Sequence, residues 1–338
     1  MRTKIVYVVT SSVEDIYWEY TWLSVWSLKQ HNPSACAVIV CDDDTLDSAK
    51  KSYRANSLEL FDEIVPVRFG SDISNKVRSR WLKTNLRNLI QGDFLYVDSD
   101  TIITDSLSEI DDFDFDIGMV YSMHTYPNPL PQVFKWYKEA FNEELPPDAH
   151  YYNGGVIYAK DSESAKLLFN SWHKNWKLAG NKVGYSDQPA LAKAILEQGN
   201  PVHELPGIYN CLACVGIRYL QKAKIMHFLH KPYFIPTVVH PFMQEETYQK
   251  IKKCKDIPEE IKKLALNCKS EFTTVSAPLG INEANFLRST VIHDFLYPIY
   301  NKKRSLFNHI DKMTSLLLSW LKRPNNIFHK YKLRVRNR

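Results

Sequence analysis

Apolar and polar positions follow two different patterns along the first third of the chain. Short apolar runs, typical of buried strands, occur at residues 4–9, 37–40, 63–67 and 94–97. The segments between these runs have the apolar spacing of amphipathic helices, at residues 16–30, 46–56 and 74–91. Because strands alternate with helices, we predict an α/β fold with a mostly parallel sheet, whose ligands bind beyond the carboxyl ends of the strands.

The pattern is more mixed in the second half of the chain. Two further strands are predicted at residues 116–121 and 155–159, and two further helices at residues 162–179 and 186–197. After about residue 240 the sequence changes to short helical segments rich in Lys and Glu. We therefore predict three parts. An α/β domain spans residues 1–240, a helical extension spans residues 241–304, and an amphipathic helix with a basic tail spans residues 305–338.

Composition and charge narrow the classes of partner. The chain has 338 residues, of which 44% are hydrophobic and 13% aromatic, and this is enough for a substantial core. Its formal net charge of +5 is concentrated at the end, because residues 322–338 contain seven Lys or Arg and no acidic residue. The rest of the chain is close to neutral, which argues against nucleic acid as the main partner and favours a local anionic surface for the tail.

The end of the chain carries an amphipathic pattern. Its apolar positions would share one helical face, at Leu306, Phe307, Ile310, Met313, Leu317, Trp320 and Leu321. With the basic run that follows, this pattern fits a helix lying on an anionic membrane, but a terminal helix packed on the main domain would show it too. The sequence opens with no secretory signal and has no long apolar stretch, so we expect a cytoplasmic protein, soluble or peripheral on the inner face of the plasma membrane.

An acidic triplet is the strongest single chemical signal. Asp98-Ser99-Asp100 directly follows the apolar run at 94–97. Two carboxylates two residues apart at a strand end can turn toward one point, and oxygen ligands suit hard cations such as Mg²⁺ or Mn²⁺. A cation held there can bind a diphosphate, which is the leaving group of an activated sugar. Because Asp-x-Asp is common, a simple solvated turn stays open on the triplet alone.

The predicted helix before this triplet carries four basic residues. They recur every three or four positions, at Lys76, Arg80, Lys83 and Arg87. This spacing would place all four on one helical face. A face that only contacts solvent would look the same. If the face is functional, Arg80 or Lys83 is the better candidate to neutralise a phosphate or hold sugar hydroxyls.

Two short motifs could contact a sugar. In Asn153-Gly154-Gly155 the glycines let the backbone approach a ligand, and the amide offers both a donor and an acceptor. Asp187 and Gln188 lie at a predicted helix start, with Ser186 as the cap and Pro189 in the first turn. A glycine turn and a plain helix cap explain these motifs equally well when each is taken alone.

A third motif combines a nitrogen ligand with a cation. His227 stands four residues before Lys231, and the segment continues Pro232-Tyr233. His227 could bind a metal ion, and Lys231 could stabilise a departing phosphate as a point charge. A lone histidine in such a segment is more often a satisfied, partly buried side chain.

The order of these elements resembles the family 8 glycosyltransferases, which include glycogenin and bacterial lipopolysaccharide galactosyl- and glucosyltransferases. The resemblance covers roughly residues 4–235. It implies a GT-A fold, which is Rossmann-like, a UDP-linked sugar donor, retention of anomeric configuration, and Mn²⁺ as the usual metal, with Mg²⁺ as the alternative.

The resemblance also implies roles for individual residues. It implies Asp98, Asp100 and His227 as metal ligands. It implies catalytic roles, at the donor sugar and its diphosphate, for Asp187, Gln188 and Lys231. The implied donor-binding residues are Thr10, Tyr17, Arg80 or Lys83, Asp98, Ser99, Asn153 and Gly154, with Tyr17 stacking on the base. The family usually has His-x-x-Gly-x-x-Lys-Pro-Trp, and the corresponding loop is two residues shorter here.

The function expected from this resemblance is transfer of a hexose, of the UDP-glucose or UDP-galactose class, to a glycan or lipid-linked glycan in surface polysaccharide or lipopolysaccharide synthesis. The cation and Lys231 would offset charge on the leaving diphosphate, while the anomeric carbon becomes oxocarbenium-like. Apart from Asp187, the sequence shows no obvious, well-placed carboxylate nucleophile near Gln188. We therefore favour attack by the acceptor on the face that the leaving group departs from over a covalent intermediate.

Two other functions stay open at this point. A nucleotidyltransferase acting on sugar phosphates would also use paired carboxylates, but its glycine-rich phosphate loop is missing from residues 10–13. A non-catalytic sugar-binding scaffold with a decayed site would lack some of the chemical groups, whereas Asp98, Asp100, Asn153, Asp187 and His227 are all present.

Overall fold

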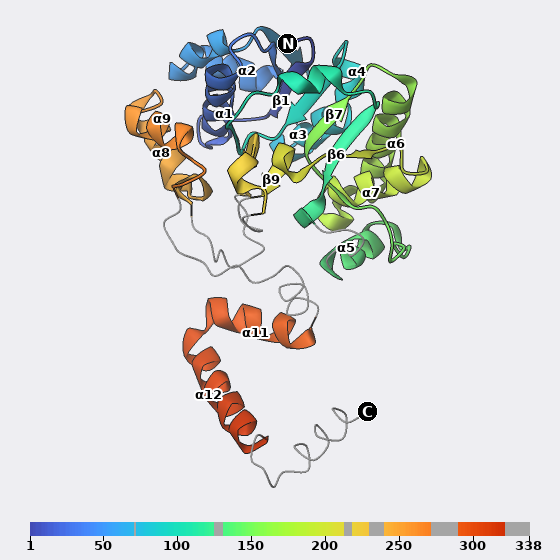
Figure 1. Cartoon of the computed structure of the whole chain (residues 1–338), viewed down its shortest axis with the longest axis vertical. Coiled ribbons are helices and arrows are strands. Elements are labelled where there is room, and N and C mark those ends of the chain that lie inside the picture. The colour runs from blue at the N-terminus through green and yellow to red at the C-terminus, as the bar shows by residue number, and fades with distance from the viewer. Residues whose placement is uncertain (71, 125–130, 213–217, 230–239, 272–289, 322–338) are drawn as a thin grey trace. The chain divides into compact units, whose positions relative to one another are not determined.

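The computed structural model describes residues 1–70, 72–124, 131–212, 218–229, 240–271 and 290–321 (Figure 1). The chain forms two compact units, which are unit 1 (Met1–Ile281) and unit 2 (Asn282–Arg338). The predicted three-part division at residues 240 and 304 stays a prediction. Each unit is described separately below.

A seven-stranded mixed sheet forms the centre of unit 1, with the strand order β3-β2-β1-β4-β7-β6-β8. Its strands are β1 (Lys4–Val9), β2 (Ala37–Asp42), β3 (Glu63–Val67), β4 (Phe94–Val97), β6 (Ile117–Tyr121), β7 (Tyr152–Ala159) and β8 (His203–Glu204). The first four are parallel, and β7 runs antiparallel to β4 and β6. This confirms the predicted α/β fold with a mostly parallel sheet.

A second, three-stranded sheet joins segments that are far apart in the sequence. Its strands are β5 (Thr101–Ile103), β9 (Cys211–Leu212) and β10 (Ile225–His227). The central strand β10 pairs antiparallel with β5 and parallel with β9. Because β5 begins directly after the acidic triplet, this pairing sets His227 opposite Thr101.

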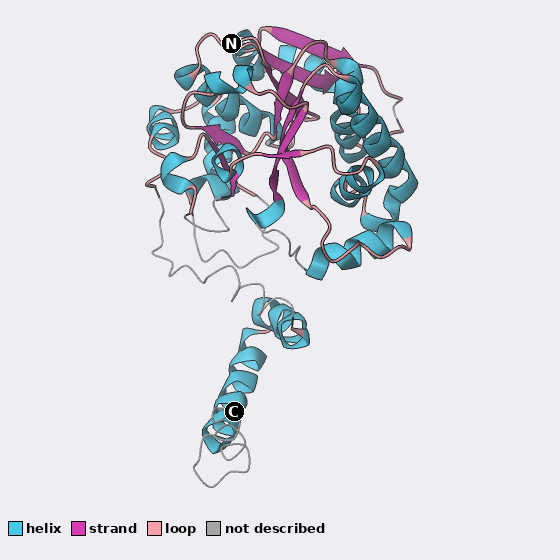
Figure 2. Ribbon diagram, turned by 45° about the vertical axis from the view of Figure 1, so that its right-hand side comes forward, coloured by secondary structure: helices cyan, strands magenta, loops and turns pink. Residues whose placement is uncertain are grey.

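Helices cover both faces of the central sheet (Figure 2). The described α-helices of unit 1 are α1 (Tyr17–His31), α2 (Asp43–Lys50), α3 (Asn75–Thr84), α4 (Leu86–Leu89), α5 (Pro131–Phe141), α6 (Glu163–Ala179), α7 (Gln188–Glu197), α8 (Glu245–Cys254) and α9 (Glu259–Leu266). Serine side chains cap two of them, since Ser74 accepts from the backbone N–H of Val77 and Ser162 from that of Ala165.

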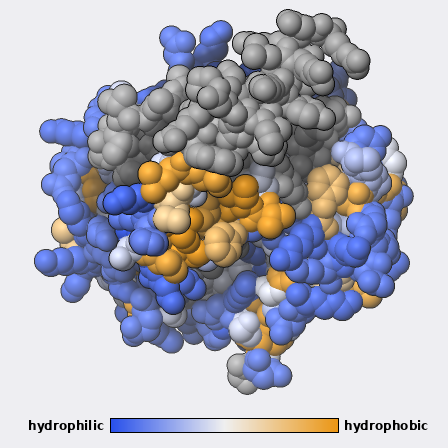
Figure 3. All heavy atoms as spheres, turned by 90° about the horizontal axis from the view of Figure 1, so that it is seen from below, coloured by the Kyte–Doolittle hydropathy of each residue, from blue (hydrophilic) through white to orange (hydrophobic). Residues whose placement is uncertain are grey.

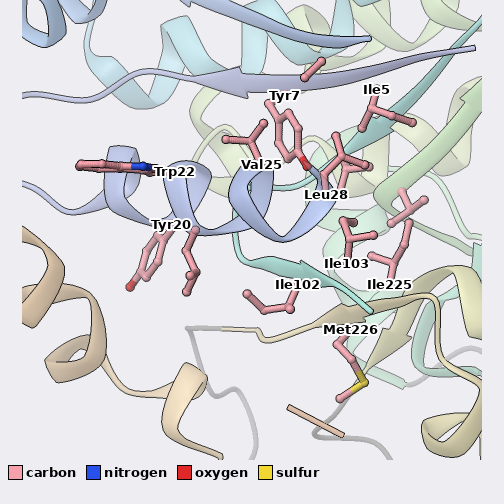
Figure 4. Close-up of a cluster of buried hydrophobic side chains, with 14 of the residues drawn as sticks. Ile5, Tyr7, Tyr20, Trp22, Val25, Leu28, Ile102, Ile103, Ile225 and Met226 are labelled. Carbon is pink, nitrogen blue, oxygen red and sulfur yellow. The ribbon is translucent and has the colours of Figure 1, made fainter. Parts of the chain in front are cut away.

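Successive side chains of β1 point alternately into two separate hydrophobic cores. Ile5, Tyr7 and Val9 face a core shared with α1, the three-stranded sheet, α8 and α9. Val6 and Val8 face the opposite core, which is shared with α3, α6 and α7. Figure 4 shows the first core, in which α1 lies between β1 and the three-stranded sheet. Both faces of the central sheet are therefore buried, as a parallel sheet requires.

Two predicted helices are wrong in their extent. The segment 46–56 forms α2 and then a separate 3-10 helix at Tyr53–Leu60. The segment 74–91 breaks at Asn85, which leaves α3 and the single turn α4. Arg87 lies in α4, and its buried guanidinium donates to the carbonyls of Ile90, Gly92 and Lys160. The four basic residues consequently do not share one helical face.

Unit 2 contains two described helices, α11 (Val291–Lys302) and α12 (Arg304–Leu321). The predicted helix at 305–321 is confirmed as α12. Both helices leave large apolar side chains exposed, at Val291, Ile292, Phe295, Leu306, Met313, Leu316 and Leu317. Within the residues that the structure describes, no helix has the length and apolar character needed to cross a membrane.

Candidate active site

Three ligand-type side chains meet where β4 ends. Asp98 and Asp100 flank the turn between β4 and β5, and His227 is the last residue of β10. One ligand atom from each lies within 4.8 Å of the others. The Nε2 atom of His227 is 3.2 Å from Oδ1 of Asp100 and 4.0 Å from Oδ2 of Asp98. The structure thus brings together residues separated by more than a hundred positions.

The chemistry of this donor set fits a divalent cation. Two carboxylates and an imidazole are oxygen and nitrogen ligands of the kind that bind divalent metal ions. The backbone leaves room beside them at Gly155, where an added Cβ would lie 2.4 Å from Cε1 of His227 and 2.8 Å from Oδ2 of Asp98. Asp98 is itself held in place, because its N–H donates to the carbonyl of Gly155 at 2.7 Å.

The two oxygens of Asp98 have different surroundings. Oδ1 accepts from the hydroxyl of Tyr96 and from Nζ of Lys83, the latter at 3.0 Å. Oδ2 is the oxygen nearer to His227. Burial, and then the neighbouring Asp98 carboxylate, raises the pKa of Tyr96, so this phenol stays a proton donor. One oxygen of Asp98 is therefore anchored by protein and the other faces the ligand cluster.

His227 carries a raised pKa. Burial by itself would lower the pKa of the ring, but the negative charges of Asp100 and Asp98 outweigh it and raise the pKa above the ordinary 6.5. A proton on Nε2 satisfies the carboxylates when no cation is bound. A metal ion at this position would have to displace that proton.

A second charged group adjoins the first. Lys83 is almost fully buried and lies between Asp98 and Asp187, with its Nζ 3.5 Å from Oδ2 of Asp187. The Nε atom of Arg80 is 3.1 Å from the other oxygen of Asp187. Burial would raise the pKa of Asp187, but Arg80 and Lys83 outweigh it and hold the pKa below its ordinary value. Asp187 is therefore an ionised carboxylate with two cationic partners.

The start of α7 differs from the prediction. The helix begins at Gln188, with Asp187 in the cap position, so Ser186 is not the cap. The carboxylate of Asp187 makes no capping hydrogen bond, because it is turned toward Arg80 and Lys83. Pro189 occupies the first turn as predicted. Asp187 thus belongs to a charge cluster and does not cap α7 through a side-chain hydrogen bond.

Gln188 ties α7 to β7. Its Oε1 accepts from the N–H of Gly154 at 2.9 Å, and its Nε2 donates to the carbonyl of Tyr152 at 2.5 Å. A Cβ on Gly154 would come 3.1 Å from that same Oε1. The two short motifs predicted as separate sugar contacts are therefore parts of one hydrogen-bonded unit.

Several predicted site residues are bonded to other parts of unit 1. The hydroxyl of Thr10 donates to the carbonyl of Asn75 at 3.0 Å, and the hydroxyl of Ser99 accepts from Thr21 at 2.9 Å. Tyr17 begins α1 with its ring half exposed. Lys231 lies outside the described residues. The roles predicted for these four residues in donor binding and catalysis stay predictions.

The sequence of this chain matches a known family. The model of Glycosyl transferase family 8 matches residues 8–240, which is more than half of the chain. The chain belongs to this family. The predicted resemblance is thereby confirmed, and the protein is a glycosyltransferase. Its α/β architecture agrees with the GT-A fold that the resemblance implied. Membership in the family decides against a nucleotidyltransferase or a scaffold as the class of protein.

Solved glycosyltransferases resemble the chain at low identity. The galactosyltransferase LgtC, solved with donor and acceptor sugar analogues, is 14% identical over 77% of this chain and 99% of its own, with a TM-score of 0.48. The glycosyltransferase GlyE from Streptococcus pneumoniae is 16% identical over 82% of this chain and 66% of its own, with a TM-score of 0.45. Mouse xyloside xylosyltransferase 1 is 14% identical over 67% of this chain and 97% of its own, with a TM-score of 0.45. No curated protein sequence matches the chain significantly.

Two residues of this glycosyltransferase site were not singled out from the sequence. Tyr96 stands two positions before Asp98, and this period-2 spacing could have placed both side chains on one face of the strand. Asn210 contacts both Asn153 and His227. No sequence pattern indicates Asn210, because β9, which follows it, has only two residues.

Proposed function

We propose that this glycosyltransferase moves a hexose from a UDP-linked donor, of the UDP-glucose or UDP-galactose class, to a glycan acceptor with retention of anomeric configuration. The observation that carries the proposal is the meeting of Asp98, Asp100 and His227 beside the Lys83–Asp187 pair. One end of this cluster suits a diphosphate, and the other offers polar side chains for a sugar. Family membership supports the donor class.

The diphosphate end would be held through a divalent cation, with Mn²⁺ the first candidate and Mg²⁺ the second. The ligands would be Asp98, Asp100 and His227, and a bound cation would stabilise the negative charge that grows on the departing diphosphate. We include Lys231 in this role on the family pattern, as a point charge near the phosphates.

The sugar end would be formed by Asn153, Asp187 and Gln188. Asp187 is buried and ionised, so it can accept a hydrogen bond from a sugar hydroxyl. Arg80 and Lys83 hold both of its oxygens, which weakens it as a nucleophile. This supports attack by the acceptor on the same face as the leaving group, without a covalent intermediate. Isolation of a sugar covalently attached to Asp187 would refute this mechanism.

Metal-dependent binding of UDP tests the proposal most directly. We expect isothermal titration to show UDP binding with Mn²⁺ and much weaker binding without it. The variant Asp100→Asn should lose the metal dependence while keeping a normal melting temperature. As a matched control, Asp112→Asn changes a carboxylate of the 3-10 helix at Ser108–Asp112, outside the site. UDP binding that is equal with and without Mn²⁺ would contradict the proposal.

The donor sugar can be found by a screen. We would incubate the full chain with UDP-glucose, UDP-galactose and other nucleotide sugars in the presence of Mn²⁺, and measure release of UDP. Hydrolysis of one hexose donor above the others identifies the substrate. Release from no UDP-linked sugar would count against the donor class.

We further propose that the acceptor is a glycan or lipid-linked glycan of surface polysaccharide or lipopolysaccharide synthesis, reached on the inner face of the plasma membrane. The exposed apolar side chains of α12, including Met313 and Leu316, support a membrane contact, as do the basic residues at 322–338. Apolar residues, among them these, are coloured orange in Figure 3. Deletion of residues 305–338 should abolish sedimentation with anionic liposomes, and unchanged sedimentation would end the membrane proposal.

A further inference from the structure

Asn210 is a buried polar side chain between the two ends of the site. It is the last residue of the 3-10 helix Gly207–Asn210 and directly precedes β9. Its side chain is fully buried. One end of its carboxamide contacts Asn153 and the other contacts His227. It therefore connects a proposed sugar ligand to a proposed metal ligand.

The backbone N–H of Gly155 determines which atoms of the Asn153 and Asn210 amides are oxygen and which are nitrogen. The N–H of Gly155 donates to Oδ1 of Asn153 at 2.8 Å, and a backbone N–H can only donate. The atom of Asn153 that faces Gly155 must then be oxygen. The same oxygen lies 3.0 Å from Asn210, so the atom of Asn210 that faces it must be the amide nitrogen.

The orientation of Asn210 also determines which nitrogen of the His227 ring carries a proton. With its nitrogen toward Asn153, Asn210 presents Oδ1 to Nδ1 of His227 at 2.9 Å. A carbonyl oxygen can only accept, so Nδ1 carries the proton. A neutral ring with its proton on Nδ1 has a free lone pair on Nε2, the atom that faces Asp98 and Asp100. Ligating histidines are commonly held in this way through their other nitrogen.

We infer that Asn210 is a positioning residue that sets the tautomer of His227 and the orientation of Asn153 together. The inference rests on the proposed function, in which His227 binds the cation and Asn153 binds the donor sugar. Because Oδ1 of Asn153 already accepts from Gly155 and Asn210, the amide nitrogen is the part of Asn153 that can donate to a sugar hydroxyl. One buried amide thus prepares both ends of the site.

Two substitutions separate these two effects. Asn210→Leu removes both hydrogen bonds at similar volume. Asn210→Asp keeps an acceptor for Nδ1–H of His227 but places an oxygen against Oδ1 of Asn153. As the control we use Asn175→Leu, because Asn175 is also buried and donates to Ser171 and Glu197, away from the cluster.

The readout is the affinity of the full chain for Mn²⁺ alone, measured by isothermal titration, together with the melting temperature and the KM for the UDP-sugar. Asn210→Leu should weaken Mn²⁺ binding roughly 10–100-fold. Asn210→Asp should keep most of the Mn²⁺ affinity and raise the KM for the UDP-sugar. Asn175→Leu should lower the melting temperature and leave Mn²⁺ affinity unchanged.

The outcomes distinguish this inference from the proposed function. Wild-type Mn²⁺ affinity in Asn210→Leu overturns the inference alone. If that variant does not fold, Asn210→Asp decides, because loss of Mn²⁺ binding in a folded Asn210→Asp chain also overturns it. A wild-type chain that binds no Mn²⁺ overturns the inference together with the metal part of the proposed function.

Discussion

Gly155 shows how closely the side chains of the site are packed. It belongs to β7, which runs beside β4, and its carbonyl accepts from the N–H of Asp98. The three atoms nearest to an added Cβ belong to His227, Asn153 and Asp98, all within 2.8 Å. Any side chain at this position would displace residues from both ends of the site.

We predict that Gly155→Ala weakens Mn²⁺ binding roughly 10–100-fold, because the methyl group pushes His227 and Asp98 out of position. Isothermal titration with Mn²⁺ checks this. The control is Gly70→Ala, where an added Cβ would lie close to the end of the Asp72 side chain, which can move. Equal Mn²⁺ affinity in the two variants would contradict the prediction.

His227 makes metal binding depend on pH. Its pKa is raised above 6.5 in the folded protein, so a proton competes with the metal ion for Nε2. The apparent Mn²⁺ affinity should therefore rise with pH through the folded pKa and then level off. Titrations with Mn²⁺ across neutral pH measure this, and a decrease in affinity over that range would refute it.

In the metal-free protein, His227 makes the stability of the folded state decrease as pH rises. A group whose pKa is raised by folding binds its proton more tightly in the native state. The stabilisation by His227 is fully present below the unfolded value near 6.5 and is lost as pH rises through the folded pKa. His227→Gln should remove this part of the pH dependence in metal-free thermal melts, and an unchanged pH dependence would contradict the assignment.

At the scale of elements, a buried ion pair holds the segment that connects β1 to α1. Glu19 of α1 and Arg54 of the 3-10 helix at Tyr53–Leu60 are almost completely inaccessible, with Nε and Oε1 2.8 Å apart. The guanidinium also donates to the carbonyls of Ser12 and Asp15. Since Thr10 and Tyr17 flank this loop, Arg54 determines the shape of a predicted part of the donor site.

We predict that Arg54→Met destabilises the protein by about 3–5 kcal/mol, because it leaves the carboxylate of Glu19 buried without its cation. Adding Glu19→Gln should recover part of the loss. Urea denaturation of both variants measures this. As a control, Lys51→Met breaks an exposed pair with Asp47 and should change stability by less than about 1 kcal/mol. Equal losses in Arg54→Met and Lys51→Met would contradict the prediction.

For the whole molecule, the division into two units has a consequence for function. The cores that surround the site include residues of α8 and α9, and all of them belong to unit 1. The apolar surface of α11 and α12 belongs to unit 2. Residues for chemistry and residues for the proposed membrane contact are therefore on separate units.

We predict that a chain ending at Ile281 keeps Mn²⁺-dependent UDP binding with an affinity close to that of the full chain, because the described ligand cluster and its supporting core lie in unit 1. A chain ending at Pro241 should unfold or aggregate, because it loses buried side chains such as Tyr248 and Ile261. Isothermal titration and thermal melts compare the two. Loss of UDP binding in the longer fragment would contradict this assignment.

Much of the framework follows from the sequence alone. Strands β1, β3 and β4 have the predicted bounds, because their apolar runs are short and end at polar residues. Their residue types made Asp98, Asp100 and His227 candidate ligands, and the family resemblance joined them into one set. The three side chains lie close together in the structure. Local patterns carry this information because a buried strand and its polar end are encoded in neighbouring residues.

Tertiary structure decided what local patterns could not. It interrupted the predicted helix at Asn85. It also turned Arg87 toward backbone carbonyls, whereas Arg80 and Lys83 face Asp187. It also placed Lys83 between two carboxylates and Asn210 between Asn153 and His227. Sequence by itself determined the fold class and the chemical groups. Their pairing depended on contacts between distant segments, where burial makes each polar group find a partner.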